Sequence, residues 1–330
     1  MKSNIIIDNS NSDDVLLTIA IPTYKRFGLL KETLKSVFSL EFNIPIEVII
    51  VDNDPEHPEL VLSEMAEFER HDFIYYKNIE NYGMFGNWNQ CLNLGRGKLI
   101  TILHDDDLLC VNFPCELERF LKEHGCHDDI PLIGFGHHLL DQRKSEDKVN
   151  KNILYKISKK IFNAFRKYII KPKVVSITLD EIFWGNIFCG TLGVVMDRNK
   201  ALSISGFDEK NYPVSDYDFW IRWIQKYGPI KYNKTKVSYY RILDNESMRP
   251  DVISNFIKKT YELRLMMIKE TPLLVNQESN AINLKKLDEY SFNVNWSREG
   301  DFNLGMLDTV NYIYIKIKCI SCKYFSFWLH

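Results

Sequence analysis

The stretch "KLITILHDDDLL", residues 98–109, joins an apolar segment to a run of carboxylates. Residues 99–103 contain one threonine among apolar residues, which is typical of a buried strand. His104 and three aspartates, residues 105–107, follow directly. Neighbouring like charges raise one another's pKa, so such a run is costly unless water or a cation compensates for it. The stretch therefore predicts a strand that ends either in a solvated turn or in a divalent-cation site.

Strands and helices alternate upstream of this stretch. Near-continuous apolar runs indicate the strands, and apolar residues at helical spacing indicate the helices. The predicted strands are 15–21, 46–52, 73–78 and 98–104, and the predicted helices are 29–38, 60–70 and 84–95. This alternation predicts an α/β fold with a mostly parallel sheet covered on both faces. Ligands of such sheets lie beyond the carboxyl ends of the strands.

Composition narrows the class of protein. The 330 residues carry a net charge of −2, so the whole chain is not a polyanion binder and no nucleic-acid partner is expected. Seven cysteines form no secreted disulfide framework, and Cys319 and Cys322 are interpreted as ordinary thiols. Residues 1–14 lack the apolar core of a signal peptide, and no run approaches the roughly 20 apolar residues of a spanning helix. We therefore expect a cytoplasmic protein.

Three polar segments should meet at one edge of the predicted sheet. "PTYKR" (22–26) ends the first strand, "VDNDPEH" (51–57) ends the second, and "HDDD" (104–107) ends the strand described above. Each alone is interpreted most simply as a solvated loop. Their convergence at the carboxyl ends of parallel strands instead predicts a binding site.

Residues 17–109 resemble the nucleotide-sugar half of the family-two glycosyltransferases, which have the GT-A fold. The resemblance rests on "TIAIPTYKR", "EVIIVDN" and "NYGMFGNWNQCLNLGRGKLITILHDDD", and a second similar segment covers 190–222. It implies a Rossmann-like, mixed but mostly parallel sheet flanked by helices. The implied organisation is a polar tail at 1–14, a GT-A domain at 15–248 and a helical extension at 249–330. The GT-A domain divides into a nucleotide-sugar half at 15–110, a basic amphipathic insertion at 150–173 and an acceptor half at 185–248.

The resemblance also implies roles for the acidic run. Mn²⁺ or Mg²⁺ would neutralise the diphosphate that leaves during sugar transfer. Aligned from Gly97, the family's carboxylates fall on Asp107, which should bind the metal, and on Asp106, near the ribose or the metal. Asp105 is then left over for solvent. His104 stands where the family often has Asp, and we favour a satisfied histidine at a strand end over a metal neighbour.

The nucleotide site follows from the same resemblance. Asp52 should accept a hydrogen bond from the base, with a turn-forming aspartate as the alternative. Uridine is the base expected because it is commonest in the family. Arg26 and Arg241 should reach the diphosphate, although a surface position for Arg26 and an ordinary ion pair for Arg241 are the alternatives. The residues assigned to nucleotide binding are Pro22, Thr23, Tyr24, Arg26, Asp52, Asn81, Gly83, Asn89 and Asp106.

The segment "PVSDYDFWIRW" (213–223) should hold the catalytic base. Ser215 and Asp218 have the spacing of a capping box, which explains Asp218 structurally. Asp216 has no such explanation, and the resemblance places the general base there, although the family's preceding Glu is Ser in this chain. Asp218 is the alternative base. Phe219 replaces the Gln of the Q-x-x-R-W signature, which argues against a processive synthase.

The insertion at 150–173 carries eight Lys or Arg and no acid, with apolar residues at helical spacing. Such a helix favours an anionic membrane surface, and packing on the second half is the equal alternative. The residues expected at the membrane are Lys156, Lys159, Lys160 and Lys167.

The expected function is therefore inverting, metal-dependent, non-processive transfer of one sugar. The donor would be a nucleotide sugar, and the acceptor a glycan or a polyprenyl-diphosphate-linked saccharide. The expected location is the cytoplasm, with peripheral attachment to the inner face of the cytoplasmic membrane. The alternative is a non-catalytic nucleotide-sugar-binding protein on the same fold.

Overall fold

The computed structural model describes residues 1–330 except 12–13, 125–131, 144–172, 244–248, 297–305 and 327–330. Within the described residues, ten strands form one sheet in the order β1-β4-β3-β2-β5-β9-β7-β10-β6, and β8 pairs with β10. The strands are β1 (Ser3–Asp8), β2 (Leu17–Thr23), β3 (Ile46–Asp52), β4 (Ile74–Asn78), β5 (Leu99–Ile102), β6 (Leu108–Leu109), β7 (Ile133–Asp141), β8 (Val174–Ile177), β9 (Val194–Asp197) and β10 (Ile230–Ile242).

Parallel pairing dominates the N-terminal part of the sheet. β4, β3, β2 and β5 are parallel neighbours, and β7 and β10 form a second parallel pair. β9 connects the two groups by antiparallel pairing with β5 and β7. The mixed, mostly parallel α/β sheet expected from the sequence is confirmed.

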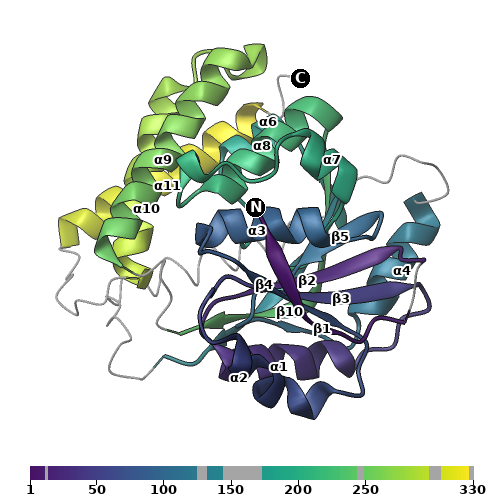
Figure 1. Ribbon diagram of the computed structural model, residues 1–330. Coiled ribbons are helices and arrows are strands. Elements are labelled where there is room, and N and C mark those ends of the chain that lie inside the picture. The colour runs from purple at the N-terminus through teal and green to yellow at the C-terminus, as the bar shows by residue number, and fades with distance from the viewer. Residues whose placement is uncertain (12–13, 125–131, 144–172, 244–248, 297–305, 327–330) are drawn as a thin grey trace.

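Helices cover both faces of this sheet (Figure 1). Along β2, Ala20 packs in the core on the side of α3 and α8, whereas Ile19 and Ile21 pack in the core on the side of α1, α2 and α4. This alternation explains why β2 is buried throughout. The helices are α1 (Phe27–Phe38), α2 (Pro58–Met65), α3 (Gly83–Leu94), α4 (Phe113–His124), α6 (Leu179–Phe183), α7 (Arg198–Ser203), α8 (Ser215–Tyr227), α9 (Pro250–Glu270), α10 (Glu278–Trp296) and α11 (Met306–Ser326).

The N-terminal segment corrects one expectation. Residues 1–14 were expected to form a polar tail, but β1 occupies Ser3–Asp8 and pairs antiparallel with β4. Three consecutive isoleucines, residues 5–7, give this segment the β propensity that its polar neighbours conceal. The sheet therefore gains an antiparallel edge strand.

Two expectations concern membranes. Residues 150–172 of the basic insertion, including Lys156, Lys159, Lys160 and Lys167, lie outside the described residues, so their membrane role stays a prediction. Among the helices that the structure describes, none combines the length and the hydropathy required to cross a bilayer.

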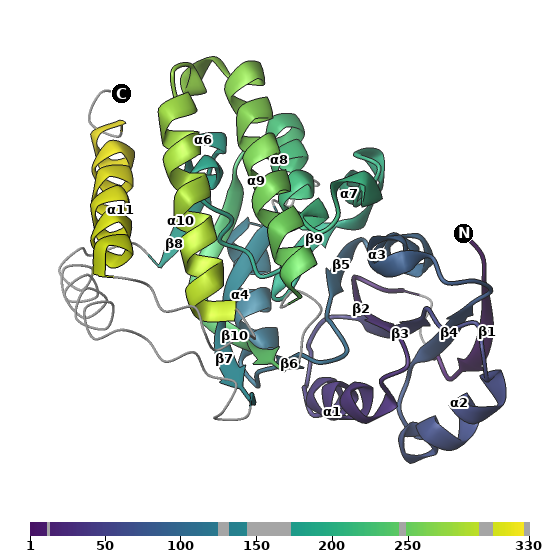
Figure 2. The same cartoon turned by 90° about the vertical axis from the view of Figure 1, so that its left-hand side faces the viewer.

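The C-terminal helices α9, α10 and α11 stand beside α6 and α8, away from β1–β4 (Figure 2). One buried cation ties them to the rest of the molecule. Arg264 of α9 pairs with Asp288 of α10 at 2.6 Å, and its Nε donates to the carbonyl of Phe183 at the end of α6 at 3.2 Å. The hydroxyl of Tyr217 in α8 donates to the neighbouring carbonyl of Ile182 at 2.8 Å. The extension is therefore anchored to the short helix that precedes the loop at 184–193.

Replacing Asp288 with Ala should destabilise the protein by about 3 kcal/mol, because the Arg264 side chain, only 2% exposed, would lose its carboxylate partner. Glu289→Ala in the same helix is the control. Its partner Lys285 lies 3.9 Å away and both side chains are more than 40% exposed, so its loss should cost well under about 1 kcal/mol. Urea unfolding measures both changes, and equal losses would contradict the anchoring role of Arg264.

Candidate active site

The acidic run occupies the turn between β5 and β6. Leu103 N donates to Ala20 O at 2.9 Å, so the chain stays beside β2 one residue beyond β5. Asp107 N then donates to His104 O at 3.1 Å, which closes the turn. Asp105 and Asp106 both pair with Arg26, whereas Asp107 accepts a hydrogen bond from the backbone of Arg241.

Asp105 is buried and braces the turn against the end of β2. Its carboxylate accepts hydrogen bonds from Thr23 Oγ1 at 2.7 Å and from Arg26, whose Nε lies 3.2 Å away. Burial raises the pKa of Asp105 to about 6, although the charge of Arg26 opposes the shift. The expectation that Asp105 is spare and solvated is therefore wrong, because Thr23 and Arg26 draw it inward.

Asp107 contributes a buried oxygen without a hydrogen bond. Its Oδ1 accepts the backbone N–H of Arg241 at 2.9 Å. Its Oδ2 accepts no hydrogen bond and lies 3.4 Å from His104 Nδ1. Burial raises the pKa of this carboxyl, whereas His104 and the backbone N–H of Arg241 oppose the shift. A nearby positive charge would stabilise such a buried carboxylate in its ionised form.

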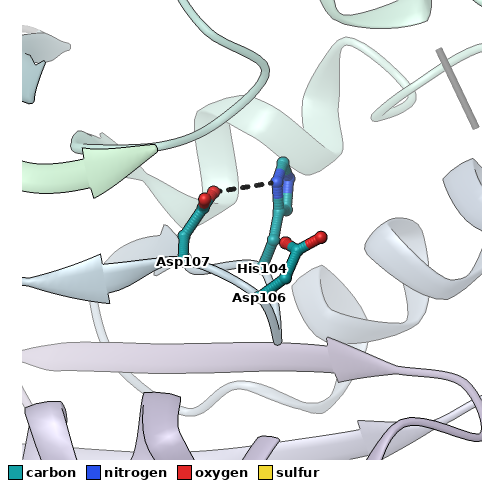
Figure 3. Close-up of side chains that lie close together, drawn as sticks. All are labelled: His104, Asp106 and Asp107. Atoms are coloured by element: carbon teal, nitrogen blue, oxygen red, sulfur yellow. Dashed lines mark ion pairs between the residues drawn. The ribbon is translucent and has the colours of Figure 1, made fainter. Parts of the chain in front are cut away.

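Figure 3 shows that Asp107 and His104 point toward one another, with Asp106 beside them. One ligand atom from each of the three side chains lies within 4.8 Å of the others. Oxygen ligands suit Mg²⁺ and Mn²⁺, and these ions keep positions for water or phosphate. Together with the uncompensated oxygen of Asp107, this donor set fits a divalent cation.

Asp216 lies in the first turn of α8 and is 9% exposed. Its Oδ2 accepts a hydrogen bond from Asn186 Nδ2 at 3.1 Å, and Asn186 Oδ1 accepts from Phe188 N at 3.0 Å. The second bond fixes the amide so that its NH₂ group faces the carboxylate. Burial raises the pKa of Asp216 to about 6, opposed by the Tyr217 backbone N–H and by Asn186. This pKa suits a general base near neutral pH.

Cys189 lies near both Asp216 and the acidic turn. Burial raises the pKa of its thiol, and the charges of Asp107, Asp216 and Asp106 raise it further. The sequence did not identify Asn186 as a partner of Asp216, because it stands 30 residues before Asp216 and no motif spacing links the two.

The expected capping box is wrong. The Ser215 hydroxyl donates to Asp208 O at 2.6 Å, and Val214 occupies the N-cap position without a side-chain bond. Asp218 instead pairs with Arg222 one turn later at 2.7 Å, and Arg222 donates to Gly206 O at 2.8 Å. Asp218 thus remains structural, but through an ion pair that fixes the preceding loop.

On the nucleotide side, Asp52 is engaged within the protein. Its Oδ1 accepts from Asp54 N at 3.0 Å, and its Oδ2 accepts from Tyr75 OH at 2.9 Å and Lys77 Nζ at 2.8 Å. The bond to Asp54 N is the turn-forming alternative considered for this residue. A base contact by Asp52 stays a prediction, and it would have to be shared with these three donors.

A network around Asn53 places Asn81 and Gly83. Asn53 Nδ2 donates to Asn81 Oδ1 at 2.7 Å and to Gly83 O at 3.0 Å, and Asn81 Oδ1 also accepts Gly83 N. Gly83 has a φ of 73°, which glycine adopts without strain. Both residues therefore shape the turn that starts α3, beside the end of β3. Pro22 is buried in β2, and the Tyr24 side chain beyond it is 44% exposed.

Two other residues assigned to the nucleotide have structural contacts. The amide of Asn89 brackets the backbone of Phe207, accepting from its N–H and donating to its carbonyl, each at 2.8 Å. Arg241 is 3% exposed, donates from Nε to Asp106 O at 2.7 Å, and pairs with Glu32 at 2.6 Å. For Arg241 this geometry favours the ion-pair alternative over a diphosphate contact.

Residues 18–171 match the family model described as glycosyl transferase family 2. This part of the chain is a glycosyltransferase domain of family 2. An uncharacterized glycosyltransferase of Methanocaldococcus jannaschii is 28% identical over 216 residues, covering 64% of this chain and 66% of the relative. The GalNAc(5)-diNAcBac-PP-undecaprenol beta-1,3-glucosyltransferase of Campylobacter jejuni is 26% identical, covering 57% and 62%. Abequosyltransferase RfbV of Salmonella typhimurium is 30% identical over 128 residues, covering 34% and 38%.

The matches to these family 2 relatives span at most 66% of their length. Among solved structures, S. aureus TarS 1–349 is similar with a TM-score of 0.53 at 13% identity, covering 91% of this chain and 79% of that one. The structure of that protein in complex with UDP-GlcNAc has the same TM-score. At this identity the likeness shows the GT-A fold alone.

The raised pKa of Asp216 predicts that the ionised carboxylate of the wild-type protein lowers the free energy of unfolding. A carboxyl whose pKa is raised on folding contributes stability that is present below its unfolded pKa, near 4, and lost as the pH rises through about 6. Asp216→Asn should therefore increase the free energy of unfolding at pH 7.5 by about 2–3 kcal/mol and leave it unchanged at pH 4. Asp218→Asn, which weakens the Arg222 pair, is the control and should destabilise at pH 7.5. A lower stability of Asp216→Asn at pH 7.5 would contradict the assignment.

Proposed function

We propose that this protein transfers one sugar from a nucleoside diphosphate sugar to a glycan or lipid-linked acceptor, with inversion at the anomeric carbon. The observation that carries the proposal is the buried, uncompensated oxygen of Asp107, which shares one site with Asp216. A cation at the first residue and a base at the second are the two groups that such a transfer requires.

On the donor side, the mechanism requires stabilisation of the negative charge on the leaving diphosphate. Asp107 and Asp106 would hold Mn²⁺ or Mg²⁺, which supplies Lewis-acid stabilisation of the leaving diphosphate. Arg26 pairs with Asp105 and with Asp106, at 3.0 Å for the latter, and its side chain is 46% exposed. Its guanidinium can therefore meet a diphosphate at the mouth of the site while keeping Asp105 neutralised.

On the acceptor side, the mechanism requires removal of one proton from the acceptor hydroxyl. Asp216 takes the proton of the acceptor hydroxyl while that oxygen bonds to the anomeric carbon, and the bond from this carbon to the diphosphate oxygen breaks. Asn186 occupies Oδ2, so Oδ1 is the oxygen that we assign to the proton. One base and one displacement give an inverted product.

The relatives guide the choice of substrates. The name of the Campylobacter relative includes a saccharide linked to undecaprenol diphosphate, and this supports a lipid-linked acceptor for this chain. The complex of TarS with UDP-GlcNAc supports a UDP-sugar donor. A lipid-linked acceptor would also give the basic segment at 150–173 a reason to meet an anionic membrane, which keeps the peripheral, cytoplasmic location a proposal.

The metal role is tested by Asp107→Asn, which removes the charge of the uncompensated oxygen. Mn²⁺ binding, measured by electron paramagnetic resonance with UDP present, should weaken more than the roughly 10–100-fold that loss of an outer-shell partner costs. Asp105→Asn is the matched control, because its carboxylate faces Thr23 and Arg26. This variant should keep Mn²⁺ binding. Equal Mn²⁺ binding by wild type and Asp107→Asn would refute the assignment.

The base is tested by turnover of Asp216→Asn against Asp218→Asn. Release of UDP from UDP-sugars in the presence of acceptor should fall by about 10²–10⁴-fold in Asp216→Asn, with donor affinity unchanged. Asp218→Asn should keep its rate at temperatures where it is folded. Proton NMR of the product should show the inverted anomer. A retained anomer would exclude single displacement, and binding of UDP-sugars without any turnover would favour the non-catalytic alternative.

A further inference from the structure

His104 is held on two sides of its ring. It stacks on Trp88 with the ring centroids 4.8 Å apart and the planes 22° from parallel. Gly190 also lies close to the ring. A Cβ atom added at Gly190 would lie only 2.9 Å from His104 Cε1. Gly190 also has a φ of 54°, so a larger residue is doubly disfavoured at this position. These contacts restrict the movement of the ring.

The hydrogen bonds of Thr191 determine which ring nitrogen carries the proton. Thr191 Oγ1 donates its hydrogen to Ile102 O at 2.9 Å. The same oxygen lies 3.2 Å from His104 Nε2, and with its hydrogen already used it can only accept there. Nε2 is consequently the N–H donor. In the neutral ring, Nδ1 then presents a lone pair.

That lone pair faces the acidic turn. Nδ1 lies 3.4 Å from Asp107 Oδ2, the buried oxygen that accepts no hydrogen bond. Neighbouring ligands of an octahedral ion at about 2.1 Å are about 3 Å apart, so one ion can contact both atoms after a small adjustment. Figure 3 shows the imidazole and the Asp107 carboxylate converging, as a shared ion requires.

We propose that His104 Nδ1 is a third protein ligand of the divalent cation, together with Asp107 and Asp106, and that Thr191 orients the ring by accepting its Nε2–H. The proposal deepens the proposed function and rests on its cation. The sequence alone favours a satisfied histidine at this position, and the contacts of the ring favour a ligand instead. Imidazole nitrogen favours transition metals, whereas carboxylate and water suit Mg²⁺. The site should therefore prefer Mn²⁺ to Mg²⁺.

The experiment reads the ligand directly and does not depend on turnover. Pulsed electron paramagnetic resonance of Mn²⁺ bound to the full chain with excess UDP should show coupling to a directly bound ¹⁴N in wild type. His104→Asp should lose the coupling and lower the ratio of Mn²⁺ to Mg²⁺ affinity by about tenfold or more. Thr191→Val, which keeps shape but removes the acceptor, should weaken Mn²⁺ binding by about tenfold.

His71→Asn is the matched control, because His71 also stacks on an aromatic ring, Phe38, at 4.2 Å. This variant should keep the nitrogen coupling and the metal preference. Bound Mn²⁺ without nitrogen coupling in wild type, or coupling that persists in His104→Asp, would overturn the ligand assignment, as would an absence of Mn²⁺ binding. Coupling in a wild-type protein that releases no UDP from any donor and acceptor would leave His104 as a ligand and refute sugar transfer.

Discussion

The structure depends on how the charges of three neighbouring carboxylates are accommodated at one buried turn. Asp105 is neutralised by Arg26 from the end of β2, and Asp107 receives the backbone N–H of Arg241 from β10. One oxygen of Asp107 remains without a hydrogen bond. Burying a carboxylate oxygen without a hydrogen bond is costly, and the cation proposed for this position would offset that cost. Binding sites commonly accept such a cost in exchange for preorganisation.

The two halves of the chain meet at this turn. The N-terminal half supplies the acidic run and the stacking partner Trp88 of His104. The second half supplies Thr191, Arg241 and the Asn186–Asp216 pair. Antiparallel pairing of β9 with β5 brings the two groups together across the sheet. The residues proposed as cation ligands and as base are therefore oriented by contacts that join residues far apart in the sequence.

The sequence predicted the elements whose burial follows a local pattern. The apolar run before His104 forms β5, as expected. The parallel part of the sheet could be predicted from the alternation of strands and helices, because a near-continuous apolar run indicates a strand that is buried on both faces. The edge strand β1 was missed, since an edge strand leaves one side unpaired and its polar neighbours obscured the signal. Within the site, the convergence of the acidic turn followed from strand order. The burial of Asp105, the bond from Asn186 and the proton position on His104 did not, because each depends on a partner distant in the chain.

The anchoring of the C-terminal helices has a consequence for the order in which the molecule is built. Arg264 bonds to the carbonyl of Phe183, 81 residues earlier, and its carboxylate partner comes 24 residues later still. Once β1–β5 have emerged from the ribosome, every strand of the parallel N-terminal part of the sheet is available. The contacts between these strands are comparatively local in the sequence. The contact between Arg264 and the end of α6 is completed only after α10 has emerged. During synthesis the N-terminal part of the sheet can therefore assemble before the C-terminal helices are anchored.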